Sequence, residues 1–173
     1  VGTVQEAIDR GAKGVSVQVN MGSPTEADMI ERLGIISSDT NYLDVPLLGM
    51  IYPRGENLSI MDGDVTEGAA HAARLAFELG CQVVKTKWTG SIESFRKVTN
   101  SVPIPVLIAG GPAGSSTEDI LQIVYDSMQA GGGGVCMGRQ VFSHENPEAM
   151  VSALKMIVHN GSEVSEAMKK CGL

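Results

Sequence analysis

Short apolar runs alternate with longer amphipathic segments five times along the chain. The apolar runs, each expected to form a strand, are 14–20, 45–52, 82–88, 104–109 and 133–137. The segments with helical periodicity that follow them are expected to form helices at 25–38, 66–78, 92–98, 117–130 and 147–159. We expect Thr25 to cap the first of these helices, because Asp28 follows three residues later. Strands that are joined through helices in this way are parallel, so the pattern predicts a series of βα units.

Polar residues within the strands favour a closed (β/α)8 barrel over an open doubly wound sheet. Central strands of a doubly wound sheet are covered on both faces and are continuously apolar. Here the first run places three polar side chains on one face, and the third places Lys85 and Lys87 together. A barrel lumen with an active site at its upper end accommodates such residues. Because a barrel needs eight strands, we expect residues 1–173 to be a single α/β domain that supplies the last five βα units of a TIM barrel. Three units would then be missing before Val1, and residues 1–10 would form the helix after the third strand.

Composition and charge exclude several classes of protein. The 173 residues include 13 Lys and Arg against 20 Asp and Glu, and the resulting net charge of −7 argues against non-specific nucleic-acid binding. No segment has the roughly 18 apolar residues that a membrane span requires, and no signal peptide is recognisable, so we expect a soluble, cytoplasmic protein. The three cysteines are isolated and the three histidines share no metal-ligand spacing. We therefore expect no disulfide framework, no metal and no cofactor.

Lys85 is the strongest candidate for chemistry. It lies near the middle of an apolar strand, where an ammonium group is costly to desolvate unless it is paired or neutral. A buried lysine with a lowered pKa can attack a carbonyl to form a Schiff base, and the iminium then accepts electrons from the adjacent C–C bond. The alternative is a surface lysine on an edge strand. The strand position leaves both interpretations open.

Further candidates follow three other strands. Tyr52 ends the second strand on its lumen face, where a phenol can transfer a proton, whereas Arg54 is expected to be solvated. Gly110 and Gly111 end the fourth strand, and Gly138 with Arg139 ends the fifth. If these are the last two strands of a barrel, their backbone N–H groups and the Arg139 guanidinium form a site for a substrate phosphate.

Five motifs in order resemble the archaeal-type class I aldolases, a family that includes fructose-bisphosphate aldolase and 2-amino-3,7-dideoxy-D-threo-hept-6-ulosonate synthase. The motifs occupy 15–23, 46–55, 84–90, 108–112 and 137–142. The resemblance implies that Lys85 forms the Schiff base and that Tyr52 is the general acid/base. It also implies that Gly110, Gly111, Gly138 and Arg139 bind phosphate, and that the protein is a homo-oligomer.

The chain departs from the family pattern at several positions. It has Lys87-Trp88 where Asn-Tyr is frequent, Ala113 where a lysine is common and Gln18 where many relatives have histidine. The aspartate that the family takes from an early strand has no counterpart in this chain. Because five strands leave two unpaired edges and lack part of the active-site rim, we expect the isolated chain to be weakly active or inactive. Segment 46–55 favours the heptulosonate synthase, with the fructose-bisphosphate aldolase and a non-catalytic phosphometabolite-binding protein as alternatives.

Overall fold

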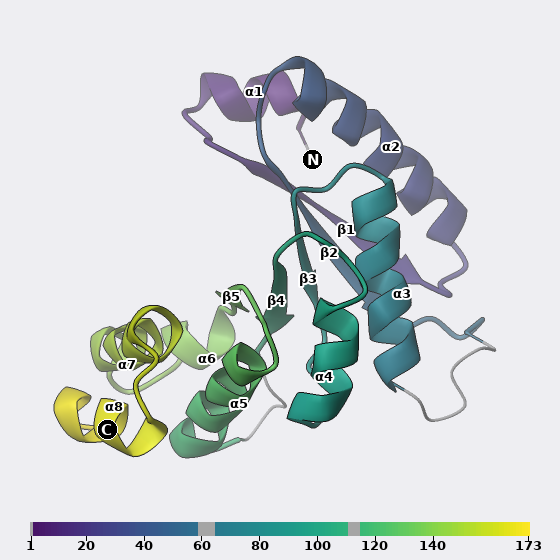
Figure 1. Cartoon of the computed structure of the whole chain (residues 1–173). Helices are drawn as coiled ribbons and strands as arrows, with labels where there is room; N and C mark the ends of the chain where they lie inside the picture. The colour runs from purple at the N-terminus through teal and green to yellow at the C-terminus, as the bar shows by residue number, and fades with distance from the viewer. Residues whose placement is uncertain (1, 59–64, 111–114) are drawn as a thin grey trace.

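The computed structural model describes residues 2–58, 65–110 and 115–173. The chain forms five strands and the helices that connect them (Figure 1). In chain order the elements are α1 (Val4–Asp9), β1 (Val15–Met21), α2 (Glu26–Tyr42), β2 (Leu47–Pro53), α3 (Val65–Glu78), β3 (Val83–Thr86), α4 (Ile92–Thr99), β4 (Val106–Ala109), α5 (Thr117–Gln129), β5 (Gly134–Cys136), α6 (Arg139–Phe142), α7 (Pro147–Asn160) and α8 (Val164–Cys171). Each predicted strand and helix is present, and the structure adds α6 and α8.

The sheet has the strand order β1-β2-β3-β4-β5, and every neighbouring pair is parallel. A doubly wound sheet reverses its strand order part-way, whereas here each strand lies beside its predecessor throughout. Crossovers of one hand between strands in such an order place their helices on one face of the sheet. In Figure 1, α2, α3, α4 and α5 follow the sheet in this way. The structure therefore confirms the predicted partial barrel.

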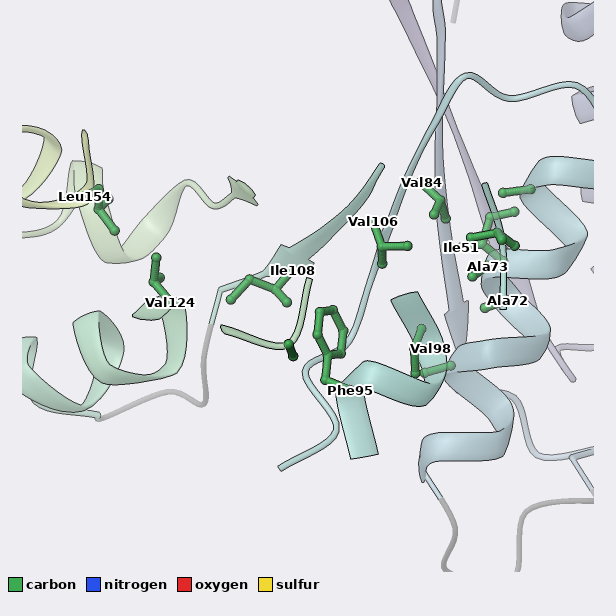
Figure 2. Close-up of a cluster of buried hydrophobic side chains, with 14 of the residues drawn as sticks. Ile51, Ala72, Ala73, Val84, Phe95, Val98, Val106, Ile108, Val124 and Leu154 are labelled. Carbon is green, nitrogen blue, oxygen red and sulfur yellow. The ribbon is translucent and has the colours of Figure 1, made fainter. Parts of the chain in front are cut away.

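The hydrophobic core lies between the sheet and these helices (Figure 2). On the helix-facing side, Val19, Ile51, Val84 and Ile108 have no exposed surface. They belong to one cluster with residues of the helices, among them Ala72, Ala73, Phe95, Val98, Val124 and Leu154. Residues of the opposite face, including Leu48, Met50, Lys85 and Leu107, are only half-buried. This side of the sheet corresponds to the lumen of a barrel.

Local interactions explain where the helices begin and end. Ser91 and Ser116 each accept a hydrogen bond from a backbone N–H of the following helix, α4 and α5. Thr25 is the N-cap residue of α2, as predicted, but its side chain makes no capping hydrogen bond. Helix α2 also continues past its expected end to Tyr42, since Thr40 is buried and its hydroxyl donates to the Ser37 carbonyl at 2.9 Å.

The free edge of the sheet at β1 borders a groove of about 910 Å³. The groove is lined by α1, the first residues of β1 and one side of α2, and it contains none of the candidate site residues. Among the described residues, no helix has the length and apolar character needed to cross a membrane.

Candidate active site

The strand register places Lys85 in the middle of a row of residues that crosses the sheet. Lys85 of β3 lies between Met50 of β2 and Leu107 of β4, and Gln18 and Gly134 continue the row on either side. Side chains at paired positions of parallel strands lie on the same face, so this row faces the lumen side. Lys85 is half-buried, and β3 is an inner strand of the sheet, so the alternative of a surface lysine on an edge strand does not apply.

Tyr52 lies two residues beyond Met50 on the lumen face of β2. Its Cα is about 8 Å from that of Lys85, from the spacing of neighbouring strands and the rise per residue. The Tyr52 side chain is buried, and the Arg54 guanidinium carbon lies 4.0 Å from the centroid of its ring. Arg54 was expected to be solvated; it is exposed, but it also makes this cation–π contact.

Lys87 occupies a position that the sequence left without a role. It lies on the same face of the chain as Lys85, one residue beyond the end of β3. Its Nζ donates a hydrogen bond to the Pro53 carbonyl oxygen at 3.1 Å, so it joins the ends of β3 and β2. The sequence shows only that Lys85 and Lys87 lie on the same face of the strand. It could not identify the acceptor, which is a backbone atom 34 residues away.

The structure brings together the two segments in which the predicted phosphate-binding glycines lie, after β4 and after β5. Ala109 and Cys136 are paired at the ends of β4 and β5, so the chain segments that follow them are neighbours. Gly110 lies so close to Gln140 that a Cβ atom there would overlap its side chain. Arg139 is exposed at the start of α6. Gly111 lies outside the described residues, as does Ala113.

His144 ties the same two segments together. Its Nε2 lies 2.9 Å from Thr117 Oγ1 at the start of α5, and its Nδ1 lies 3.0 Å from both the backbone nitrogen and oxygen of Asn146. The three histidines share no metal-ligand spacing, so nothing in the sequence indicated this contact between two loops. Within residues 2–58, 65–110 and 115–173, no group of three His, Cys, Asp or Glu side chains could hold a metal ion.

The arrangement corresponds to a known family of enzymes. A family model described as DeoC/LacD family aldolase matches residues 1–144. The chain belongs to the DeoC/LacD aldolase family. It is 42% identical to "2-amino-3,7-dideoxy-D-threo-hept-6-ulosonate synthase" of Halobacterium salinarum, over 99% of this chain and 63% of that protein.

Solved structures of other aldolases have the same fold. The chain superposes on the crystal structure of an archaeal fructose 1,6-bisphosphate aldolase with a TM-score of 0.85 and 34% identity, covering 92% of this chain and 63% of that one. A second structure, of an archaeal fructose-1,6-bisphosphate aldolase whose catalytic lysine is covalently bound to the carbinolamine intermediate of the substrate, gives 0.83 and 34%. It covers 90% of this chain and 62% of that one. The chain thus spans less than two thirds of the length of each of these DeoC/LacD relatives.

Proposed function

We propose that the chain carries the Schiff-base site of a class I aldolase or transaldolase that acts on a phosphorylated sugar or ketone in the cytoplasm. The main support is the position of Lys85 on the lumen face of β3, an inner strand that is paired with β2 on one side and β4 on the other. Among the relatives, the second archaeal aldolase has its catalytic lysine bound to a carbinolamine. Such chemistry agrees with a primary amine at the end of a parallel strand.

In the proposed reaction, the Lys85 amine adds to the substrate ketone and gives a carbinolamine, which loses water to form an iminium ion. When the neighbouring C–C bond breaks, its electron pair moves into the iminium and leaves an enamine, while the departing carbon becomes an aldehyde. Tyr52 is the proposed acid/base that accepts and returns the proton in these steps. Protonation of the enamine and hydrolysis then release the ketone and restore Lys85.

The distribution of charge supports a phosphorylated substrate. Four cations, Lys85, Lys87, Arg54 and Arg139, lie near the carboxyl ends of β2, β3 and β5, although the whole chain has a net charge of −7. A local excess of positive charge attracts phosphate esters. We assign phosphate binding to Gly110, Gly111, Gly138 and Arg139, of which Arg139 offers a bidentate guanidinium group.

Within this class we propose the heptulosonate synthase as the activity of the whole protein. The name of the Halobacterium relative and the segment 46–55 support it. Fructose-bisphosphate aldolase is the second candidate, and the archaeal structures at 34% identity favour it. Both reactions start from an iminium at Lys85, so one experiment tests the part that they share.

Borohydride reduction tests the Schiff base. Borohydride converts an iminium to a stable secondary amine, so incubation with dihydroxyacetone phosphate should leave one covalent adduct, which peptide mass spectrometry should place on Lys85. Lys85→Met should abolish the adduct, and Lys97→Met, a change at an exposed position of α4, should retain it. If Lys85 stays unmodified while phosphate still binds, the chain is a non-catalytic phosphometabolite-binding protein.

A further inference from the structure

Strands β2 and β3 separate at the level of Lys85. Their pairing ends with Met50 and Lys85, whereas β2 remains paired with β1 as far as Pro53 and Met21. The last three residues of β2, Ile51 to Pro53, therefore have a strand partner on the β1 side only. Tyr52 belongs to this one-sided segment. A strand end held from one side opens more easily than one held from both.

The side chain of Lys87 crosses this gap. Its Nζ donates to the Pro53 carbonyl oxygen at 3.1 Å, in a partly buried position. On the other side of the same peptide group, the Arg54 N–H donates to the Met21 carbonyl at 3.3 Å, and the next N–H, of Gly55, donates to the same carbonyl at 2.8 Å. The peptide group between Pro53 and Arg54 is thus held on one side by the backbone of β1 and on the other by the Lys87 ammonium, which follows β3.

We propose that Lys87 is a positioning residue, which replaces the missing ladder hydrogen bonds between β2 and β3 and thereby holds Tyr52 beside Lys85. A hydrogen bond from an ammonium to a carbonyl is stronger than one between neutral groups, so a single contact suits this purpose. Proton transfer requires the acid/base group at hydrogen-bonding distance, and a displacement of about 1 Å can slow a reaction on the order of 100-fold. The inference rests on the proposed Schiff-base function of Lys85 and Tyr52.

Lys87 and Lys85 have different positions along the strand, and this gives them different roles. Both side chains are on one face, but Lys85 lies within the paired part of β3 and Lys87 lies beyond it. With its ammonium directed at the Pro53 carbonyl, Lys87 contacts the neighbouring strand end. A role of Lys87 in binding the substrate phosphate, instead of in positioning, is the competing outcome of the test.

The experiment compares Lys87→Met, Lys87→Arg and the surface control Lys97→Met in the 173-residue chain. Amide hydrogen exchange at Arg54 and Gly55 reports the strand end directly. We expect Lys87→Met to accelerate it by about tenfold, Lys87→Arg to restore slow exchange because arginine can also donate to the carbonyl, and Lys97→Met to have no effect. Unchanged exchange in Lys87→Met would overturn the proposal.

Two measurements with dihydroxyacetone phosphate separate positioning from binding. Borohydride trapping reports the iminium at Lys85, and replacement of the substrate's carbon-bound α-proton by deuterium from D2O reports its conversion to the enamine. We expect Lys87→Met to keep the adduct yield within about twofold and to slow deuterium incorporation by about 10- to 100-fold, with recovery in Lys87→Arg. We expect Tyr52→Phe to slow incorporation to a similar extent.

Equal losses of adduct and deuterium incorporation would overturn the positioning role in favour of substrate binding, and an unchanged rate of incorporation would also overturn it. If the parent chain forms no adduct, the proposed Schiff-base function fails. The proposal that Lys87 positions Tyr52 for this reaction then fails with it, whereas the amide exchange still shows whether Lys87 holds the end of β2. The two failures are therefore distinguishable.

Discussion

The guanidinium group of Arg54 lies over the ring of Tyr52, with 4.0 Å between its central carbon and the ring centroid. The two residues are separated only by Pro53, the last residue of β2, so their side chains lie on the same side of the extended chain. The contact covers a buried phenol at the mouth of the proposed site with an exposed cation. It provides a direct way to test how Tyr52 is held.

Replacing Arg54 with alanine should lower the free energy of unfolding by about 0.5–1 kcal/mol, because the cation–π contact is lost at a partly exposed site. The same change should accelerate nitration of Tyr52 by tetranitromethane, measured by peptide mass spectrometry. Tyr42, which is 88% exposed, provides an internal control whose nitration rate should not change. Equal nitration of Tyr52 in both proteins would show that Arg54 does not shield the ring.

Thr86 is buried between the two lysines of the β3 segment, and its hydroxyl has no hydrogen-bond partner. Thr86→Val keeps the shape of the side chain and removes an unsatisfied polar atom, so it should raise the free energy of unfolding by about 1 kcal/mol. Thr86→Ser keeps the hydroxyl and loses a methyl group, so it should lower that free energy by about 1 kcal/mol. Urea unfolding of the three proteins tests both signs, and a less stable valine variant would contradict the interpretation.

Gly49 of β2 packs closely against Ala76 of α3 and against Cys81, which follows that helix. A Cβ atom at this position would lie 2.8 Å from Cys81 Sγ and 3.3 Å from Ala76 Cβ. Gly49→Ala should therefore lower the free energy of unfolding by about 1–3 kcal/mol through overpacking. Cys81→Ala makes room for the added methyl group, so the double variant should be more stable than the sum of the two single effects predicts. Additive effects would exclude a direct contact.

Burial raises the pKa of the Cys81 thiol from 9.0 to about 11. The folded chain then holds this proton more tightly than the unfolded chain, which contributes stability below pH 9 that is lost as the pH rises through about 11. Between pH 8 and pH 10.5, the parent chain should lose more stability than Cys81→Ala, because the variant lacks this thiol. Urea midpoints at the two pH values measure the difference, and parallel losses would contradict it.

Arg139 should contribute to phosphate affinity, since it is the one Lys or Arg among residues 134–142, which include β5 and α6. Arg139→Gln should weaken binding of inorganic phosphate by about tenfold, measured by calorimetric titration. Arg74→Gln is the matched control, because Arg74 is paired with Glu78 on the outer surface of α3. A similar loss in both variants would indicate a general charge effect instead of a site.

The sequence predicted strands and helices well where apolar and polar residues alternate with a regular period. The alternation in 14–20 and 82–88 identified β1 and β3 and the face on which Lys85 lies. The predicted helix 25–38 ends four residues before α2 does, because the burial of Thr40 depends on tertiary packing. Helices α6 and α8 were not predicted: α6 has only 4 residues, and α8 follows Gly161, beyond the last βα unit of the pattern.

By itself, the sequence determined the βα units, their parallel direction, the choice of a barrel and the candidates Lys85 and Tyr52, because periodicity and residue chemistry are local properties. Tertiary structure decided which distant atoms meet. Two such contacts are the hydrogen bond from Lys87 to the Pro53 carbonyl and the contact between His144 and Thr117, each between residues more than 25 positions apart. Tertiary structure also decided that the pairing of β2 with β3 ends at Lys85. Such contacts depend on register and on where each strand ends, and no periodicity within one segment carries that information.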